Sequence, residues 1–94
     1  MIRVTVRYHN LLRRTTRIAE ERIELPESTS VRNALRHLAQ RHRSPLREML
    51  FDREGSPSLY LVIFRNRQLL RPEQHDDLLS DDDDLMLFPA VSGG

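Results

Sequence analysis

One segment of the chain has the periodicity of a long amphipathic helix, and segments with the character of β-strands stand on both sides of it. Within residues 31–41, apolar residues recur at helical spacing, at Val31, Ala34, Leu35, Leu38 and Ala39. Ser30 or Thr29 precedes this stretch as the expected N-cap, because a hydroxyl there accepts a hydrogen bond from a free amide of the first turn. The apolar stripe is one face wide, which predicts one main helix lying across a sheet.

The segment before this helix has the pattern of a β-hairpin. One side of the first strand is apolar, with Ile2, Val4, Val6 and Tyr8. The other side is polar, with Arg3, Thr5, Arg7 and His9. Residues 10–17 are mostly polar and basic, and we interpret them as a turn. The strand pattern returns in residues 18–25, with Ile23 and Leu25 on the inner side, which predicts an antiparallel partner strand.

The segment after the helix contains the strongest strand signal. Ser44 and Pro45 are expected to begin a short helix, as the cap and the first helical residue, with Leu46, Met49 and Leu50 facing inward. Residues 59–64 form a continuous apolar run that predicts a strand. The chain then continues with a turn at 66–67, a brief edge strand at 69–70, an acidic connection at 76–84 and a last strand at 85–88.

This order of elements predicts an α+β domain with the β-grasp (ubiquitin-like) arrangement. One main helix packs on a mixed sheet of four to five strands, and the first and last strands are central and parallel to each other. We expect residues 1–88 to form this single domain and residues 89–94 to form a flexible C-terminal tail.

The two apolar runs also predict a docking surface. A sheet that is covered by helices on one face has strands that alternate between apolar and polar residues. The runs at 59–64 and 85–88 are instead apolar on both faces. Part of the uncovered face is therefore expected to be an apolar patch of the kind that marks a protein–protein surface. The alternative is that the short helix at 44–50 or a second copy of the chain covers it.

The last residues, Val91-Ser92-Gly93-Gly94, directly follow a predicted strand. Two glycines offer no side-chain chemistry, but they place a carboxylate on a thin segment that can enter a narrow slot. A protein with its reactive group at this carboxylate is a carrier on which other enzymes act. A frayed end or a cloning scar without a role is the alternative interpretation.

The composition excludes several kinds of site. Cysteine is absent, which excludes disulfides, thiolate metal ligands and a cysteine nucleophile. Lysine is absent as well, so an activated C-terminal acyl group would find no side-chain amine on other copies of the chain. The acidic stretch lacks the ligand spacing of a calcium-binding loop, and the four histidines show no paired spacing. We therefore expect no metal site.

The charge and hydropathy of the chain give expectations about its surroundings. A net charge of +1 gives no overall attraction to nucleic acid or membrane, and the small basic group at Arg13, Arg14 and Arg17 has few aromatic neighbours for RNA bases. No apolar stretch approaches the roughly 18–20 residues that span a bilayer. The first residues resemble a strand rather than a signal peptide, so we expect a cytoplasmic protein.

The C-terminal motif resembles that of the MoaD/ThiS family of ubiquitin-like sulfur carriers. The specific part is the ending Pro89-Ala90-Val91-Ser92-Gly93-Gly94, and the order of elements extends the resemblance over nearly the whole chain. Two positions depart from the family pattern: Asp82 stands where a turn glycine is usual, and Ala90 stands where a second proline is frequent. The chain is also longer than typical bacterial members, mainly through residues 44–58.

The resemblance implies a carrier function and assigns roles to particular residues. Gly94, preceded by Gly93, would be adenylated and then converted to a thiocarboxylate. The partner-binding residues would be Phe64, Phe88, Pro89, Val91 and Ser92. The ATP would be bound by a MoeB/ThiF-like activating enzyme, because this chain has no glycine-rich phosphate loop and is expected to bind no cofactor itself.

Several acceptors of the sulfur remain compatible with the resemblance. The chain would supply molybdopterin synthesis as the small subunit of molybdopterin synthase, together with the large subunit, and would contribute no catalytic side chain. Cysteine or thiamin biosynthesis is an alternative destination. A further alternative is a ubiquitin-like modifier that is attached to target lysines through Gly94, and the last is an interaction module with an inert tail.

Overall fold

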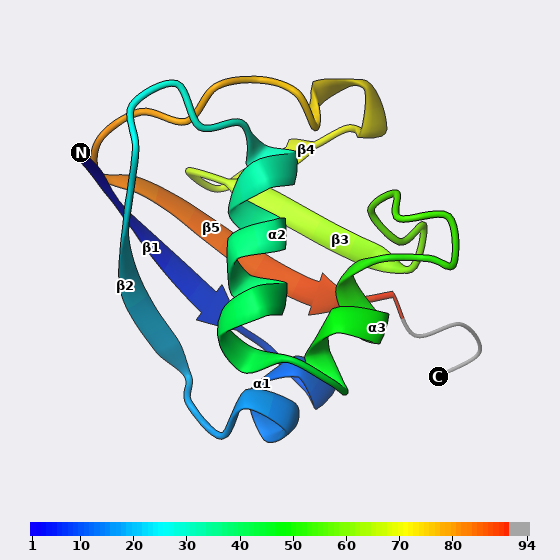
Figure 1. Cartoon of the computed structure of the whole chain (residues 1–94). Helices are drawn as coiled ribbons and strands as arrows, with labels where there is room; N and C mark the ends of the chain where they lie inside the picture. Colours follow the sequence, from blue (N-terminus) through cyan, green and yellow to red (C-terminus); the bar gives the residue numbers. More distant parts are fainter. Residues whose placement is uncertain (91–94) are drawn as a thin grey trace.

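A five-stranded mixed sheet is the frame of the computed structural model, which describes residues 1–90 (Figure 1). The strands lie in the order β2-β1-β5-β3-β4. At the centre, β1 (Ile2–Tyr8) and β5 (Asp83–Pro89) are parallel to each other. β2 (Glu20–Leu25) pairs antiparallel with β1, β3 (Leu61–Arg65) pairs antiparallel with β5, and β4 (Gln68–Leu70) forms the edge. The predicted β-grasp arrangement, with the first and last strands central and parallel, is confirmed.

The main helix, α2 (Val31–His42), lies across the sheet as predicted (Figure 1). The side chain of Ser30 caps it and accepts a hydrogen bond from the amide of Asn33 at 3.1 Å. The five predicted apolar residues of its stripe are all buried: Val31, Ala34, Leu35, Leu38 and Ala39. Burial of each leucine stabilises the fold by about 1.5–3 kcal/mol, so this stripe is a large part of what holds the helix on the sheet.

The interpretation of residues 10–17 as a turn is wrong, because α1 (Leu11–Thr16) is a short helix. Asn10 and Arg17 flank it with left-handed φ values of 56° and 65°. No side chain caps its first turn, and six residues are too few for a helix that is stable by itself. The burial of Leu12 in the core, at 1% exposure, supplies the tertiary contact that overrides the polar local sequence.

The predicted short helix is present as α3 (Leu46–Leu50), although Ser44 does not cap it. Pro45 takes the N-cap position, and the hydroxyl of Ser44 donates instead to the carboxylate of Glu48. Leu46 and Leu50 are buried, as expected, and Met49 packs against the core from a half-buried position.

The strand predicted from residue 59 begins only at Leu61, so this part of the prediction is wrong. Leu59 and Tyr60 lie in a turn and are 85% and 70% exposed. The hydroxyl of Ser58 accepts a hydrogen bond from the Tyr60 amide, and its carbonyl accepts one from the Leu61 amide. These bonds shape a turn before the pairing of Leu61 with Pro89 starts the ladder. The apolar run therefore begins two residues before the strand that it predicts.

The connection from β4 to β5 begins with the 3-10 helix η1 (Pro72–Gln74) and ends in an acidic turn. β5 itself is longer than predicted, since it starts at Asp83 and ends at Pro89 rather than spanning 85–88. Within residues 1–90, no helix is long and apolar enough to cross a membrane.

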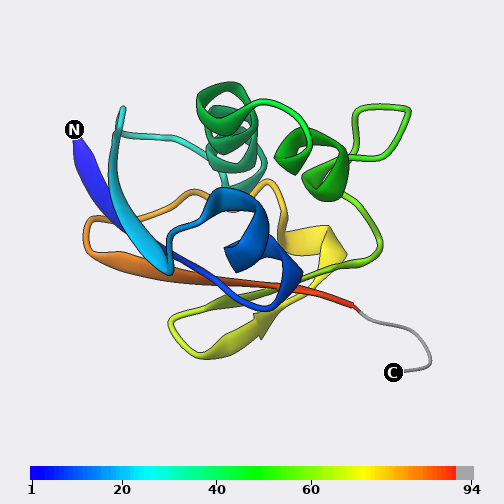
Figure 2. The same cartoon turned by 90° about the horizontal axis from the view of Figure 1, so that it is seen from below.

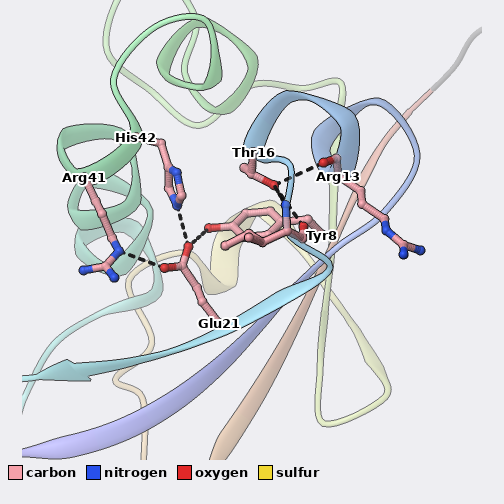
Figure 3. A network of polar contacts seen from close by, with 7 residues as sticks. Tyr8, Arg13, Thr16, Glu21, Arg41 and His42 are labelled. Carbon is pink, nitrogen blue, oxygen red and sulfur yellow. Dashed lines mark hydrogen bonds and ion pairs between the residues drawn. The ribbon is translucent and has the colours of Figure 1, made fainter.

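A group of partly buried polar contacts ties the end of α2 to the sheet (Figure 3). The carboxylate of Glu21 on β2 accepts hydrogen bonds from Tyr8 Oη at 2.6 Å, His42 Nε2 at 2.5 Å and Arg41 Nε at 2.8 Å. Burial by itself would raise the pKa of Glu21, but the hydrogen bonds from Tyr8 and His42 outweigh it, so the pKa is lowered. Burial beside this carboxylate also raises the pKa of Tyr8. The network fixes the register between helix and sheet.

All three α-helices lie on one side of the sheet (Figure 2). The core is formed between them and the inner sides of the strands, with Val4, Val6, Leu85 and Leu87 fully buried. In the described part of the chain, the opposite side of the sheet is covered by no helix (Figure 2). The alternative that the short helix at 44–50 covers this side is thereby excluded.

Candidate functional site

The uncovered side of the sheet carries a cluster of apolar side chains, which we call the outer-face patch: Val62, Phe64, Leu69, Met86 and Phe88. Ile63 and Leu87 point into the core, so their neighbours along each strand point outward. The strand register places Val62 opposite Phe88, and Phe64 between Met86 and Leu69. Four members are half-buried, and Leu69 is 57% exposed. The structure thus has the apolar patch that the two runs predicted.

Aromatic contacts join the patch to the end of β1. The rings of Phe64 and Phe88 meet edge to face, with centroids 5.7 Å apart and planes at 78°. His9 stacks on Phe88 with centroids 4.1 Å apart and planes at 7°. The Nε2 atom of His9 is buried and has no hydrogen-bond partner within residues 1–90. The sequence placed His9 on the polar side of its strand, but nothing in the pattern of one strand indicated this stacking with another.

Charged residues border the patch on the side of β1. Arg7 lies beside Met86 in the parallel register, donates from Nε to Asp84 Oδ2 at 2.7 Å, and pairs with Glu20 at 2.8 Å. The hydrogen bond to Asp84 raises the pKa of Arg7. An apolar centre with a charged rim is the usual anatomy of a protein–protein interface.

The chain leaves the sheet directly beside this patch. Pro89 pairs with Leu61 as the last residue of β5, and the amide of Ala90 donates to the carbonyl of Tyr60 at 2.5 Å. The backbone is therefore held in place for two residues after Phe88. Val91, Ser92, Gly93 and Gly94 lie outside the described residues, and their roles stay predictions, as do the partner contacts of Phe64, Phe88 and Pro89.

The acidic turn before β5 has a structural role in the fold. Asp83 is buried and accepts hydrogen bonds from Ser80 N at 2.8 Å, Asn66 Nδ2 at 2.8 Å and Arg65 Nε at 3.0 Å. Burial by itself would raise the pKa of Asp83, but these donors outweigh it and lower the pKa. Asp82, which stands where the family usually has glycine, adopts a left-handed φ of 66°. Aspartate tolerates this region better than most side chains, so the turn is kept.

The described residues do not form a metal centre that would be an alternative candidate site. Within residues 1–90, no group of three or more histidine or acidic side chains is placed to hold a metal ion. What the site offers is an apolar face for a protein, beside the backbone of Pro89 and Ala90, which the sheet holds in place.

Comparison with known proteins places the chain among small ubiquitin-like proteins. The sequence model of the ThiS family matches residues 6–94. The crystal structure of SAMP1 from Haloferax volcanii is similar over 98% of this chain and 99% of that one, with a TM-score of 0.83 and 24% identity. A putative molybdopterin converting factor, subunit 1, from Pyrococcus furiosus has a TM-score of 0.76 and 29% identity, over 97% of this chain and 100% of that one.

The same fold occurs in the structure of the BexX/CysO complex from Amycolatopsis orientalis. The similarity covers 97% of this chain and 99% of that one, with a TM-score of 0.70 and 23% identity. Among curated proteins, none matches this chain. The structural likenesses confirm the predicted ubiquitin-like β-grasp fold.

Proposed function

The chain belongs to the ThiS family of ubiquitin-like sulfur carriers and modifiers, and we propose that it is a sulfur carrier with the Gly94 carboxylate as its reactive group. The observation that carries the proposal is the position of the outer-face patch. Phe88 belongs to this patch, and Pro89 and Ala90 follow it at the end of the sheet. A protein that docks on the patch would therefore hold the base of the tail as well.

The chemistry needs a partner that activates the carboxylate. An oxygen of the Gly94 carboxylate attacks the α-phosphorus of ATP, which forms an acyl-adenylate and releases pyrophosphate. A hydrosulfide ion from the sulfur donor then attacks the acyl carbon, AMP leaves with the electron pair of the broken C–O bond, and the sulfur loses its proton. The product is a C-terminal thiocarboxylate. We propose that a MoeB/ThiF-like activating enzyme binds ATP and supplies the catalytic groups. This chain docks on that enzyme and delivers its terminal carboxylate.

The length of the tail is compatible with delivery into a buried site. Residues 91–94 follow Ala90, and four residues extend over at most about 14 Å. The domain would stay docked outside the partner while the terminal carboxylate enters. Glycine at the last two positions allows entry where a side chain would not fit.

We propose molybdopterin synthesis as the destination of the sulfur, with this chain as the small subunit of molybdopterin synthase. Support comes from the Pyrococcus furiosus protein, which is named as a putative molybdopterin converting factor subunit and shares 29% identity. Cysteine and thiamin synthesis remain alternative destinations.

A second candidate function is protein modification through Gly94. Its support is the likeness to SAMP1, whose name in a related structure is small archaeal modifier protein. Both candidates share the adenylate, and they differ in what attacks it.

The test is the intact mass of the protein after incubation with an activating enzyme of this family, ATP and a sulfur donor. We expect the mass increase that corresponds to one oxygen exchanged for sulfur. Deletion of Gly94 should abolish this increase and leave the melting temperature unchanged, since the described core ends before residue 91. Normal thiocarboxylate formation on the shortened chain would contradict the proposal, and adducts on lysines of other proteins would favour the modifier.

A further inference from the structure

A groove lies on the helix side of the molecule, away from the outer-face patch. It is bounded by the C-terminal half of α2, by α3 and by the loop at residues 51–55, and its volume is about 630 Å³. Figure 1 shows α3 beside the end of α2, and Figure 2 shows α3 and the loop that follows it on the side opposite the uncovered face. We call it the arginine groove, because its lining includes Arg36, Arg43, Arg47 and Arg53.

These arginines are not paired with carboxylates within the described part of the chain. None of the four forms an ion pair there, whereas Arg7, Arg32, Arg41 and Arg65 each pair with a carboxylate. Four guanidinium groups in one concavity repel each other, and an anion in the groove would relieve that repulsion.

The two carboxylates that line the groove are engaged elsewhere. Asp52 Oδ1 accepts hydrogen bonds from the amides of Glu54 at 2.9 Å and Ser56 at 3.0 Å, which shape the loop. The carboxylate of Glu48 accepts the hydroxyl of Ser44 at 2.5 and 2.9 Å. Two negative charges against four positive charges leave the lining with an excess of two positive charges.

The groove also has an apolar part. Phe51 is half-buried and packs against the core, and Ala39 of α2 is buried beside it. An aromatic ring that enters the groove could pack on Phe51, and guanidinium groups stack on aromatic rings as well. The volume lies within the range of about 300–1,000 Å³ that is typical of small-molecule sites.

We propose that the arginine groove binds a phosphate-bearing small molecule with an aromatic ring, of the size of a nucleotide. The planar guanidinium group matches phosphate oxygens with two parallel hydrogen bonds, and several arginines would share the charge of one phosphate chain. The concave shape favours a small molecule over the flat contact of a protein. This site needs neither the outer-face patch nor the tail, so it stands independently of the sulfur chemistry.

The experiment is a titration of the full ¹⁵N-labelled chain with ADP, inorganic pyrophosphate and a hexaglutamate peptide, followed through the backbone amide shifts. The groove variant combines Arg47→Glu and Arg53→Glu, which are exposed. The matched control combines Arg13→Glu and Arg14→Glu on α1, which changes the net charge equally and also alters exposed residues. Retained dispersion of the amide signals shows that each variant is folded.

We expect ADP to cause saturable shifts in residues 36–55 of the wild type and the control. Binding to the groove variant should be weaker by about tenfold or more, because two charge-assisted contacts are replaced by repulsion. Pyrophosphate that binds as tightly as ADP would overturn the assignment of a ring. Binding of hexaglutamate but not ADP would overturn the phosphate assignment in favour of an acidic protein segment. Absence of saturable shifts, or equal weakening in both variants, would overturn the site.

Discussion

The last strand, β5, carries apolar residues on both of its faces, and the two faces have different uses. On the inner face, Leu85 and Leu87 of β5 are fully buried under the helices. On the outer face, Met86 and Phe88 of the same strand are only half-buried, because no helix of the described chain covers them. Consecutive residues of one strand thus contribute either to the core or to a surface that is available to a partner.

This difference separates stability from recognition. The inner face has lost its contact with water through folding, so its apolar area contributes to the free energy of unfolding. The outer face keeps part of its apolar area exposed, and a partner that covers it gains that area on binding. Substitutions on the inner face should therefore lower the free energy of unfolding, and those on the outer face should weaken partner binding.

The largest loss is expected for Leu87→Ala, with Met86→Ala as the neighbouring control on the other face. Leu87 is completely buried, so its truncation leaves a cavity and should cost about 2–5 kcal/mol of unfolding free energy. Met86 is only half-buried, so Met86→Ala should cost clearly less unfolding free energy. Chemical denaturation of both variants measures the difference. Equal losses would contradict the division between the two faces.

A smaller loss of unfolding free energy is expected for Asp83→Asn, at the buried polar position where β5 begins. Asparagine has nearly the same shape but loses the charge that accepts hydrogen bonds from Ser80, Asn66 and Arg65, at a cost of about 1–3 kcal/mol at pH 7. Urea denaturation at pH 7 measures this cost.

The cost of Asp83→Asn should depend on pH in a definite direction. The folded state lowers the pKa of Asp83 below its ordinary value of 3.8, so the charged form stabilises the fold above that pH. This contribution is lost as the pH falls through the folded-state pKa. The wild type and the variant should therefore differ fully at pH 7 and converge below about pH 4. A difference that stays constant down to acidic pH would show that the carboxylate charge is not responsible.

The parts of the fold that could be predicted are those with long periodic patterns. The five apolar positions of α2 and the alternation of β1 each identify the buried face of one element. The β-grasp arrangement was predicted from the order of all the elements along the chain. α1 was missed because six residues carry too little pattern, and its helix depends on the burial of Leu12 by distant parts of the chain. The start of β3 at Leu61 could not be predicted from hydropathy. It depends on hydrogen bonds to Ser58, which hold Leu59 and Tyr60 in a turn before the strand.

The candidate site was predictable to the same extent. Two strands that are apolar on both faces indicated a patch, but a continuous apolar run does not show which of its residues face outward. The burial of Ile63 in the structure is what places Phe64 on the outer face. The stacking of His9 on Phe88 could not be predicted, because it depends on the parallel register between the first and last strands. The arginine groove was not found either, since its members come from two helices and a loop and show no pattern in the chain.

The measurement that tests the central claim most directly is the affinity of the activating enzyme for Phe64→Asp, titrated beside wild type and a Leu11→Asp control. Leu11 is an exposed apolar residue on α1, on the helix side. We predict that Phe64→Asp costs about 1–2 kcal/mol of stability, because the half-buried ring loses its contact with Phe88. It should nevertheless weaken binding at least tenfold, or by about 1.4 kcal/mol. Leu11→Asp should bind like wild type. Unchanged affinity of a folded Phe64→Asp variant would contradict the claim that the outer face docks the partner.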